Sequence, residues 1–219
     1  MVRRFLLMIT FLTSATCGVA EAYLLPAGTV IHKASQVLEK QAGCNLSLKG
    51  TLQRDDEVHP INAHWSFAQK SQIQFEDQNG QKVIWSPGSK PPPDPHQLLP
   101  HASVLQVLHL LFGRAELKTV ILQHGIDKTQ QRLGLHGTTV AHVVGARLPA
   151  SRNSQIWLDQ ENFVITRIRF SDAGHDMDLE LKNWNGPMSK GRFPQDIIIR
   201  MDGRERHHLR VTTFRGKGD

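Results

Sequence analysis

The stretch WSFAQKSQIQFEDQNGQKVIW, residues 65–85, carries the pattern that decides the fold. Its large apolar residues alternate with polar ones, and this alternation places the apolar side chains on one face of a strand. These residues are Trp65, Phe67, Ile73, Phe75, Val83 and Trp85. The pair Asn79-Gly80 is typical of a tight hairpin turn. The stretch therefore predicts a β-meander with one apolar face.

The C-terminal half of the chain repeats this strand pattern. The strand-like segments cover residues 156–158, 163–170, 177–181, 197–201 and 209–213. Turn sequences such as Asn185-Gly186-Pro187 and Asp202-Gly203 separate them. Consecutive strands on short turns indicate an antiparallel sheet, because a parallel sheet needs a helix between successive strands.

Two segments interrupt the strand pattern and predict helices. Residues 26–43 have one apolar face, with Thr29 as the N-cap and Gly43 as the C-terminal stop. Residues 103–112 are apolar on every side. A helix of that composition has to be buried or has to cover an apolar cavity.

The apolar helix begins with a capping-box pair, Ser103 and Gln106, and a shorter helical segment follows at about residues 115–124. The proline-rich residues 91–95 can continue neither a helix nor a sheet, so they mark a surface connection. We expect the helices to cover the concave side of the sheet. The predicted fold class is mainly β with helices: an open antiparallel β-barrel or curved sheet lidded by two or three helices.

Composition excludes several classes of protein. The 219 residues are 39% hydrophobic and 21% charged, which suits one or two globular domains. The net charge of +6 is spread along the chain without a Lys/Arg block, so we expect no nucleic-acid partner. The two cysteines, Cys17 and Cys44, cannot build a disulfide scaffold or a Cys-rich zinc site.

The N-terminus has the features of a secretory signal peptide covering residues 1–22. Arg3 and Arg4 precede a short apolar run, and Ala20-Glu21-Ala22 is a suitable cleavage site. The mature chain would then be one domain, residues 23–219, located in the periplasm. Two alternatives remain. One is lipidation at Cys17, whose preceding residues fit a lipoprotein cleavage site poorly. The other is an uncleaved membrane anchor, which would need ~20 apolar residues, more than the apolar run provides.

The sequence shows no pattern typical of an enzyme or a metal site. Adjacent His207 and His208 point to opposite faces of a strand, and neither a G-x-S-x-G elbow nor a glycine-rich phosphate loop is present. Cys44 has the setting of a small buried residue, and the carboxylates at 55–57 and 176–180 have the spacing of a solvated turn and a solvated strand face. We therefore expect no catalytic residue, no metal and no cofactor.

The apolar face itself has two interpretations. The strand residues of the opening stretch, covered by a helix that includes Leu108 and Phe112, can fill the interior or leave a cavity for an aliphatic ligand. Periodicity does not distinguish a filled barrel from a hollow one, and a plain core is the commoner outcome.

Three strings in the chain resemble a known family. Residues 143–170 contain Gln155, Trp157, Asp159, Glu161 and Phe163, which match a Q-x-W-x-D-x-E-x-F hairpin. The others are residues 183–203, with Arg192-Phe193-Pro194 before a strand, and the opening helix, expected to end in LKGTL at 48–52. Together they resemble the LolA/LolB-like periplasmic lipoprotein carriers, particularly the divergent outer-membrane lipoprotein-sorting proteins, over essentially the whole mature chain.

The resemblance implies an open barrel of about ten or eleven antiparallel strands whose cavity holds acyl chains. The residues expected to bind lipid are Trp65, Phe67, Ile73, Phe75, Val83, Trp85, Leu108 and Phe112. Lys70 stands where the family has an arginine that helps to close the cavity. Because lysine lacks the planar fork of arginine, this closure is in doubt here.

The expected function is that of a carrier, or lipoprotein chaperone, that shields the acyl chains of lipoproteins or phospholipids on the way to the outer membrane. Expected partners are an inner-membrane transporter, an outer-membrane acceptor and, transiently, the membrane. The alternative is an envelope sensor on the same fold that signals lipid or lipoprotein binding to a protein partner. A hydrolase would instead need a polar cluster inside the cavity.

Overall fold

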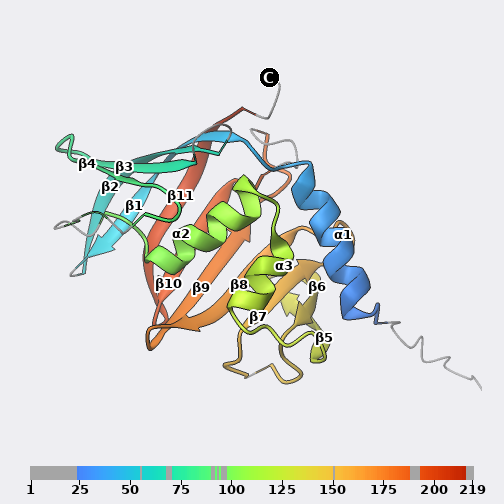
Figure 1. Ribbon diagram of the computed structural model, residues 1–219. Coiled ribbons are helices and arrows are strands. Elements are labelled where there is room, and N and C mark those ends of the chain that lie inside the picture. The colour runs from blue at the N-terminus through green and yellow to red at the C-terminus, as the bar shows by residue number, and fades with distance from the viewer. Residues whose placement is uncertain are drawn as a thin grey trace, which may run out of the picture.

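The structure is a computed structural model that describes residues 24–54, 56–67, 71–89, 92, 94, 98–149, 151–187 and 193–215. Eleven strands form one antiparallel sheet in the order β4-β3-β2-β1-β11-β10-β9-β8-β7-β6-β5 (Figure 1). The strands are β1 (Asn45–Arg54), β2 (Glu57–Ser66), β3 (Gln72–Asp77), β4 (Lys82–Trp85), β5 (Gln131–His136), β6 (Thr139–Val144), β7 (Gln155–Asp159), β8 (Ile165–Asp172), β9 (His175–Lys182), β10 (Asp196–Met201) and β11 (Arg204–Arg215). The predicted fold class is confirmed: the sheet is curved, antiparallel and not closed.

The first and last strands pair at the centre of this sheet. Asn45 is opposite Arg215, and the ladder continues to Leu52 opposite His207. Thr212 Oγ1 also donates a hydrogen bond to the carbonyl of Ser47, 165 positions away. The two edges, β4 and β5, are consecutive along the chain. The segment between them therefore crosses from one edge of the sheet to the other.

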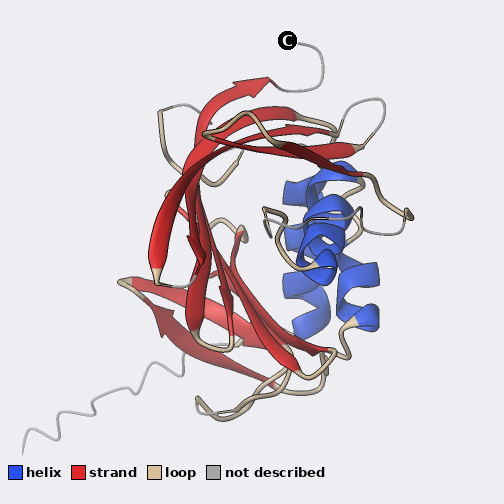
Figure 2. Cartoon of the chain, turned by 90° about the vertical axis from the view of Figure 1, so that its left-hand side faces the viewer, coloured by secondary structure: helices blue, strands red, loops and turns tan. Residues whose placement is uncertain are grey.

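The helices lie on the concave side of the sheet (Figure 2). They are α1 (Ala27–Glu39), α2 (Ala102–Leu108), the π-helical turn η1 (His109–Gly113) and α3 (Leu117–Gln123). The predicted helices are confirmed, with three corrections. α1 has Pro26 and not Thr29 as its N-cap, and it ends at Glu39, before the predicted stop at Gly43; α2 begins after His101 without a side-chain cap. Ser103 Oγ forms a hydrogen bond with His101 Nδ1 (2.8 Å), so the predicted capping box is wrong.

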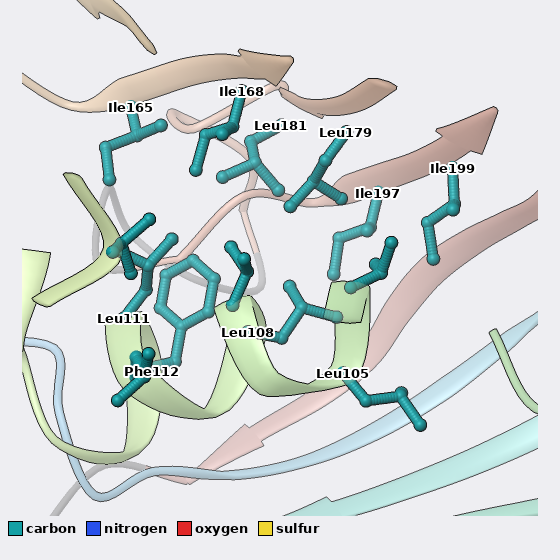
Figure 3. Packing of buried hydrophobic residues seen from close by; sticks show 14 of the residues in the cluster. Leu105, Leu108, Leu111, Phe112, Ile165, Ile168, Leu179, Leu181, Ile197 and Ile199 are labelled. Atoms are coloured by element: carbon teal, nitrogen blue, oxygen red, sulfur yellow. The ribbon is translucent and has the colours of Figure 1, made fainter. Parts of the chain in front are cut away.

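The apolar helix fills most of the concave face. Its apolar residues from Val104 to Phe112 are all buried, because the sheet lies on one side of the helix and the other helices and the chain flank it. Figure 3 shows Leu108, Leu111 and Phe112 packed over side chains of β8, β9 and β10, namely Ile165, Ile168, Leu179, Leu181, Ile197 and Ile199. The sheet face opposite η1 is thus a packed core.

The convex face carries a network of ion pairs. Arg167 holds Asp178 through two hydrogen bonds, and Arg200 Nη1 lies 2.8 Å from Glu180 Oε1. Glu180 is only 7% exposed, so the prediction that it belongs to a solvated strand face is wrong. The neighbouring side chains of His136, Lys182 and Arg200 hold the pKa of Glu180 far below its usual range.

A glycine in β1 provides the first test of this packing. A Cβ on Gly50 would lie 2.1 Å from the carbonyl oxygen of His208 in the neighbouring strand β11. We expect Gly50→Ala to lower the free energy of unfolding by about 2 kcal/mol, because the central ladder has to shift. On α1, a Cβ on Gly28 would meet nothing within 4 Å, so Gly28→Ala is expected to stabilise by about 0.5 kcal/mol. Urea unfolding measures both; equal effects of the two substitutions would contradict this packing.

Candidate functional site

An apolar cavity lies on the concave side, between the N-terminal end of α2 and one end of the sheet. Its volume is about 300 Å³. The strands that reach it are β1, β4, β9, β10 and β11, and the described residues 92, 94 and 99–101, between β4 and α2, also line it. Its apolar lining includes Leu52, Trp85, Leu99, Leu105, Met177, Ile199 and Met201. The cavity exists because α2 begins at Ala102, so the helix does not reach this end of the sheet.

Strand alternation explains how these side chains come together. Leu52 in β1, Met177 in β9 and Ile199 in β10 are buried, and each faces the concave side. Their strands lie close together in the sheet order β1-β11-β10-β9. Leu105 projects from the first turns of α2 and closes the cavity from the helix side. Two of the lining residues, Met177 and Met201, are methionines, whose flexible side chains adapt to ligands of variable shape.

A buried histidine lies at the cavity wall. His207 is 3% exposed, and its Nε2–H donates to the carbonyl oxygen of Leu98 at 3.0 Å. This bond ties β11 to the connection that covers the cavity. Burial lowers the pKa of His207 to about 4, so the ring is neutral at pH 7. Its Nδ1 has no hydrogen-bond partner among the residues that the structure describes.

The residues predicted to bind lipid do not all lie at the cavity. Trp85 lines the cavity. The structure brings Trp65, Phe67 and Phe75 together, with the ring centroid of Trp65 at 6.2 Å from Phe67 and 6.4 Å from Phe75. Phe75 in turn lies 5.9 Å from the His207 ring, so this aromatic cluster supports the cavity wall from behind.

The other predicted residues belong to the packed core. Ile73, Val83, Leu108 and Phe112 are at most 5% exposed and are not part of the cavity lining. Lys70 lies outside the described residues. The sequence pattern did not single out Met177, Ile199, Met201, Arg206 or His207 as binding residues. The alternation of Met177, Ile199 and Met201 in their strands was the signal that these three face inward.

Two other observations bear on chemistry. Cys44 is buried, and desolvation raises the pKa of its thiol to about 12, so it does not form the thiolate that a nucleophile requires. Within the described part of the chain, no group of three His, Cys, Asp or Glu side chains could hold a metal ion.

A second hollow of about 420 Å³ lies near the β5–β6 turn, but polar residues such as Asp159, Lys182 and Asn183 line much of it.

The fold and the cavity define a class of protein: an open antiparallel sheet with helices on its concave face and an apolar cavity at one end. No family model matches the chain, and no curated protein matches it. A crystal structure of a LolA superfamily protein from Nitrosomonas europaea is similar, with a TM-score of 0.50, 14% identity, and coverage of 89% of this chain and 95% of that chain. The chain therefore has a LolA-like fold.

Two further solved structures are similar at lower TM-scores. A domain described as a candidate outer membrane lipoprotein-sorting protein from Vibrio parahaemolyticus gives a TM-score of 0.45 at 10% identity, over 88% of this chain and 94% of that one. A DUF1329 family protein from Desulfovibrio piger gives 0.47 at 7% identity, over the same shares of the two chains, 88% and 94%. Among the described residues, no helix is long and apolar enough to cross a membrane.

Proposed function

We propose that this protein is a periplasmic carrier that binds the acyl chain of a lipoprotein or phospholipid and carries it toward the outer membrane. The observation that carries the proposal is the apolar cavity at the end of α2, within a LolA-like sheet. An inner-membrane transporter and an outer-membrane acceptor belong to the same proposal. The role is non-enzymatic, since binding and release of a chain need no covalent step.

The size of the cavity agrees with reversible binding. A volume of about 300 Å³ corresponds to about ten units the size of a water molecule, at ~30 Å³ each. A methylene group has about the same volume, so the cavity accommodates part of one acyl chain. At ~0.8 kcal/mol per methylene, burial contributes about 8 kcal/mol, and association offsets a large part of that gain. A chain held this strongly can still be transferred to another binder.

Ala102 is suited to a test of the cavity, because it is the first residue of α2 and lines the cavity. We expect Ala102→Trp to fill the mouth and to weaken the binding of a fluorescent acyl probe by at least about tenfold. Leu122→Trp is the matched control, because Leu122 is 74% exposed on α3, away from the cavity. Titration of both variants, with thermal unfolding to check the fold, gives the comparison.

Unchanged probe binding by a folded Ala102→Trp variant would contradict the proposed site. A transfer assay separates the two roles of a lipid-binding protein. Movement of labelled lipid or lipoprotein from donor to acceptor vesicles is expected of a carrier. Binding without transfer would favour the sensor alternative.

A further inference from the structure

We propose that Arg206 makes this cavity selective for single-chain amphiphiles with an anionic head group, of which a fatty acid is the simplest. The inference rests on the proposed function and specifies the ligand of the same cavity. The acyl chain occupies the apolar space beneath α2, and the guanidinium of Arg206 binds the carboxylate at the mouth.

A β-bulge gives Arg206 its position. In the ladder between β10 and β11, Ile199 is opposite His207 and Arg200 is opposite Glu205, so Arg206 is the extra residue with no partner across the ladder. In a regular strand, adjacent side chains point to opposite faces. Here both Arg206 and its neighbour His207 line the cavity. A bulge re-aims a side chain in this way, and it places a cation at the rim of an apolar space.

Among the described residues, Arg206 forms no close ion pair, although its charge contributes to lowering the pKa of Asp202. Its Nε is buried and makes no hydrogen bond to any residue that the structure describes. Asp94, a carboxylate in the cavity lining, accepts hydrogen bonds from the backbone amides of Leu98 (2.9 Å) and Leu99 (2.6 Å) instead. Guanidinium and carboxylate groups form paired, charge-assisted hydrogen bonds, which are strong where water is partly excluded.

Two polar groups, His101 in the cavity lining and Asp202 near Arg206, already have partners within the protein. His101 Nδ1 lies 2.8 Å from Ser103 Oγ and 3.5 Å from Asp172 Oδ2. Asp202, on the turn before β11, accepts a hydrogen bond from the backbone amide of Asp176 and contacts His175. Both the charge of Arg206 and the volume of the cavity therefore favour one chain with one negative head group.

The test compares dodecanoic acid with its methyl ester at pH 8, below the micelle concentration, by calorimetric titration. The two ligands have the same chain and differ in the charge of the head group. We expect the wild-type protein to bind the acid at least about tenfold more tightly than the ester, the range of a hydrogen bond to a charged group.

Substitution of the arginine completes the test. Arg206→Gln is expected to weaken binding of the acid about tenfold and to leave binding of the ester unchanged. Arg204→Gln is the matched control, because Arg204 is exposed two positions earlier on the same strand and its substitution removes the same charge. Thermal unfolding of both variants checks that the fold is retained.

Each outcome decides a different question. Equal binding of acid and ester, or an equal effect of Arg206→Gln and Arg204→Gln, would overturn the role of Arg206 and leave the carrier proposal intact. Failure of both ligands to bind would overturn the inference. Failure of diacyl phospholipid and acylated peptide in the same titration would then also refute the carrier proposal.

Discussion

Phe112→Ala is expected to lower the free energy of unfolding by about 4 kcal/mol, since truncating a buried phenylalanine in a core typically costs about 3–5 kcal/mol. Phe112 is 0% exposed in the π-helical turn η1. Its ring centroid lies 4.4 Å from that of Phe193 and 6.4 Å from that of Trp184. The loss of these contacts leaves a void that the rigid sheet cannot fill. Urea unfolding followed by circular dichroism measures the change.

Leu122→Ala is the control for Phe112→Ala. Leu122 is 74% exposed on α3, so its truncation is expected to change stability by less than about 0.5 kcal/mol. The comparison also separates the two interpretations of the apolar face. A loss below about 1 kcal/mol in Phe112→Ala, together with weaker lipid binding, would place Phe112 in an acyl cavity and not in the core.

The second large effect is a loss of stability in acid. Burial lowers the pKa of His207 in the folded protein to about 4, below the ordinary value of ~6.5. Between these two values the unfolded chain binds a proton that the folded protein does not bind. The free energy of unfolding therefore falls as the pH falls from about 6.5 to about 4, and a difference of this size corresponds to about 3 kcal/mol. Urea unfolding at pH 7.5 and pH 4.5 measures most of this loss.

Other titratable groups also make the free energy of unfolding depend on pH. Burial also lowers the pKa of His109 and His142, which adds to the same loss. His136, Lys182 and Arg200 hold the pKa of Glu180 low in the folded state, so the contribution of Glu180 to stability is lost only below about pH 4.5.

His207→Leu isolates the contribution of His207. The variant loses the titrating ring and the bond to Leu98, so it should be less stable at pH 7.5 and should depend less steeply on pH between 7.5 and 4.5. His32→Gln is the control, because His32 is exposed on α1. The same pH slope in wild type and His207→Leu would show that His207 does not titrate as its burial requires.

Much of the fold could be predicted from local pattern, with informative omissions. The alternation in residues 65–85 and in the C-terminal half corresponds to β2–β4 and β7–β11. The pattern did not predict β1, β5 or β6. In β1, Gly50 takes a position that the alternation of Leu46, Leu48 and Leu52 would give to an apolar residue, and LKGTL lies in this strand and not at the end of the opening helix. In β5 only Leu133 and Leu135 are apolar. Backbone pairing with neighbouring strands defines β1, β5 and β6, and a single sequence does not reveal it.

The site was less accessible from the sequence, for a physical reason. Periodicity predicts which face a residue occupies, and the prediction that His207 and His208 lie on opposite faces is confirmed: His207 is buried, while the side chain of His208 is 39% exposed. It does not predict where a helix ends or where a ladder shifts by one residue. The cavity results from the position at which α2 begins, and its rim results from the bulge at Arg206.

The pairing of β1 with β11 has a consequence for how the chain folds. The central ladder joins segments about as far apart as the sequence allows, and contacts of such high sequence separation make folding slow. Until β11 is in place, β1 and β10 both present unpaired backbone along a full strand, which is a template for aggregation. A chain that ends before residue 204 would therefore have two separate half-sheets, each with an additional unpaired, aggregation-prone edge strand.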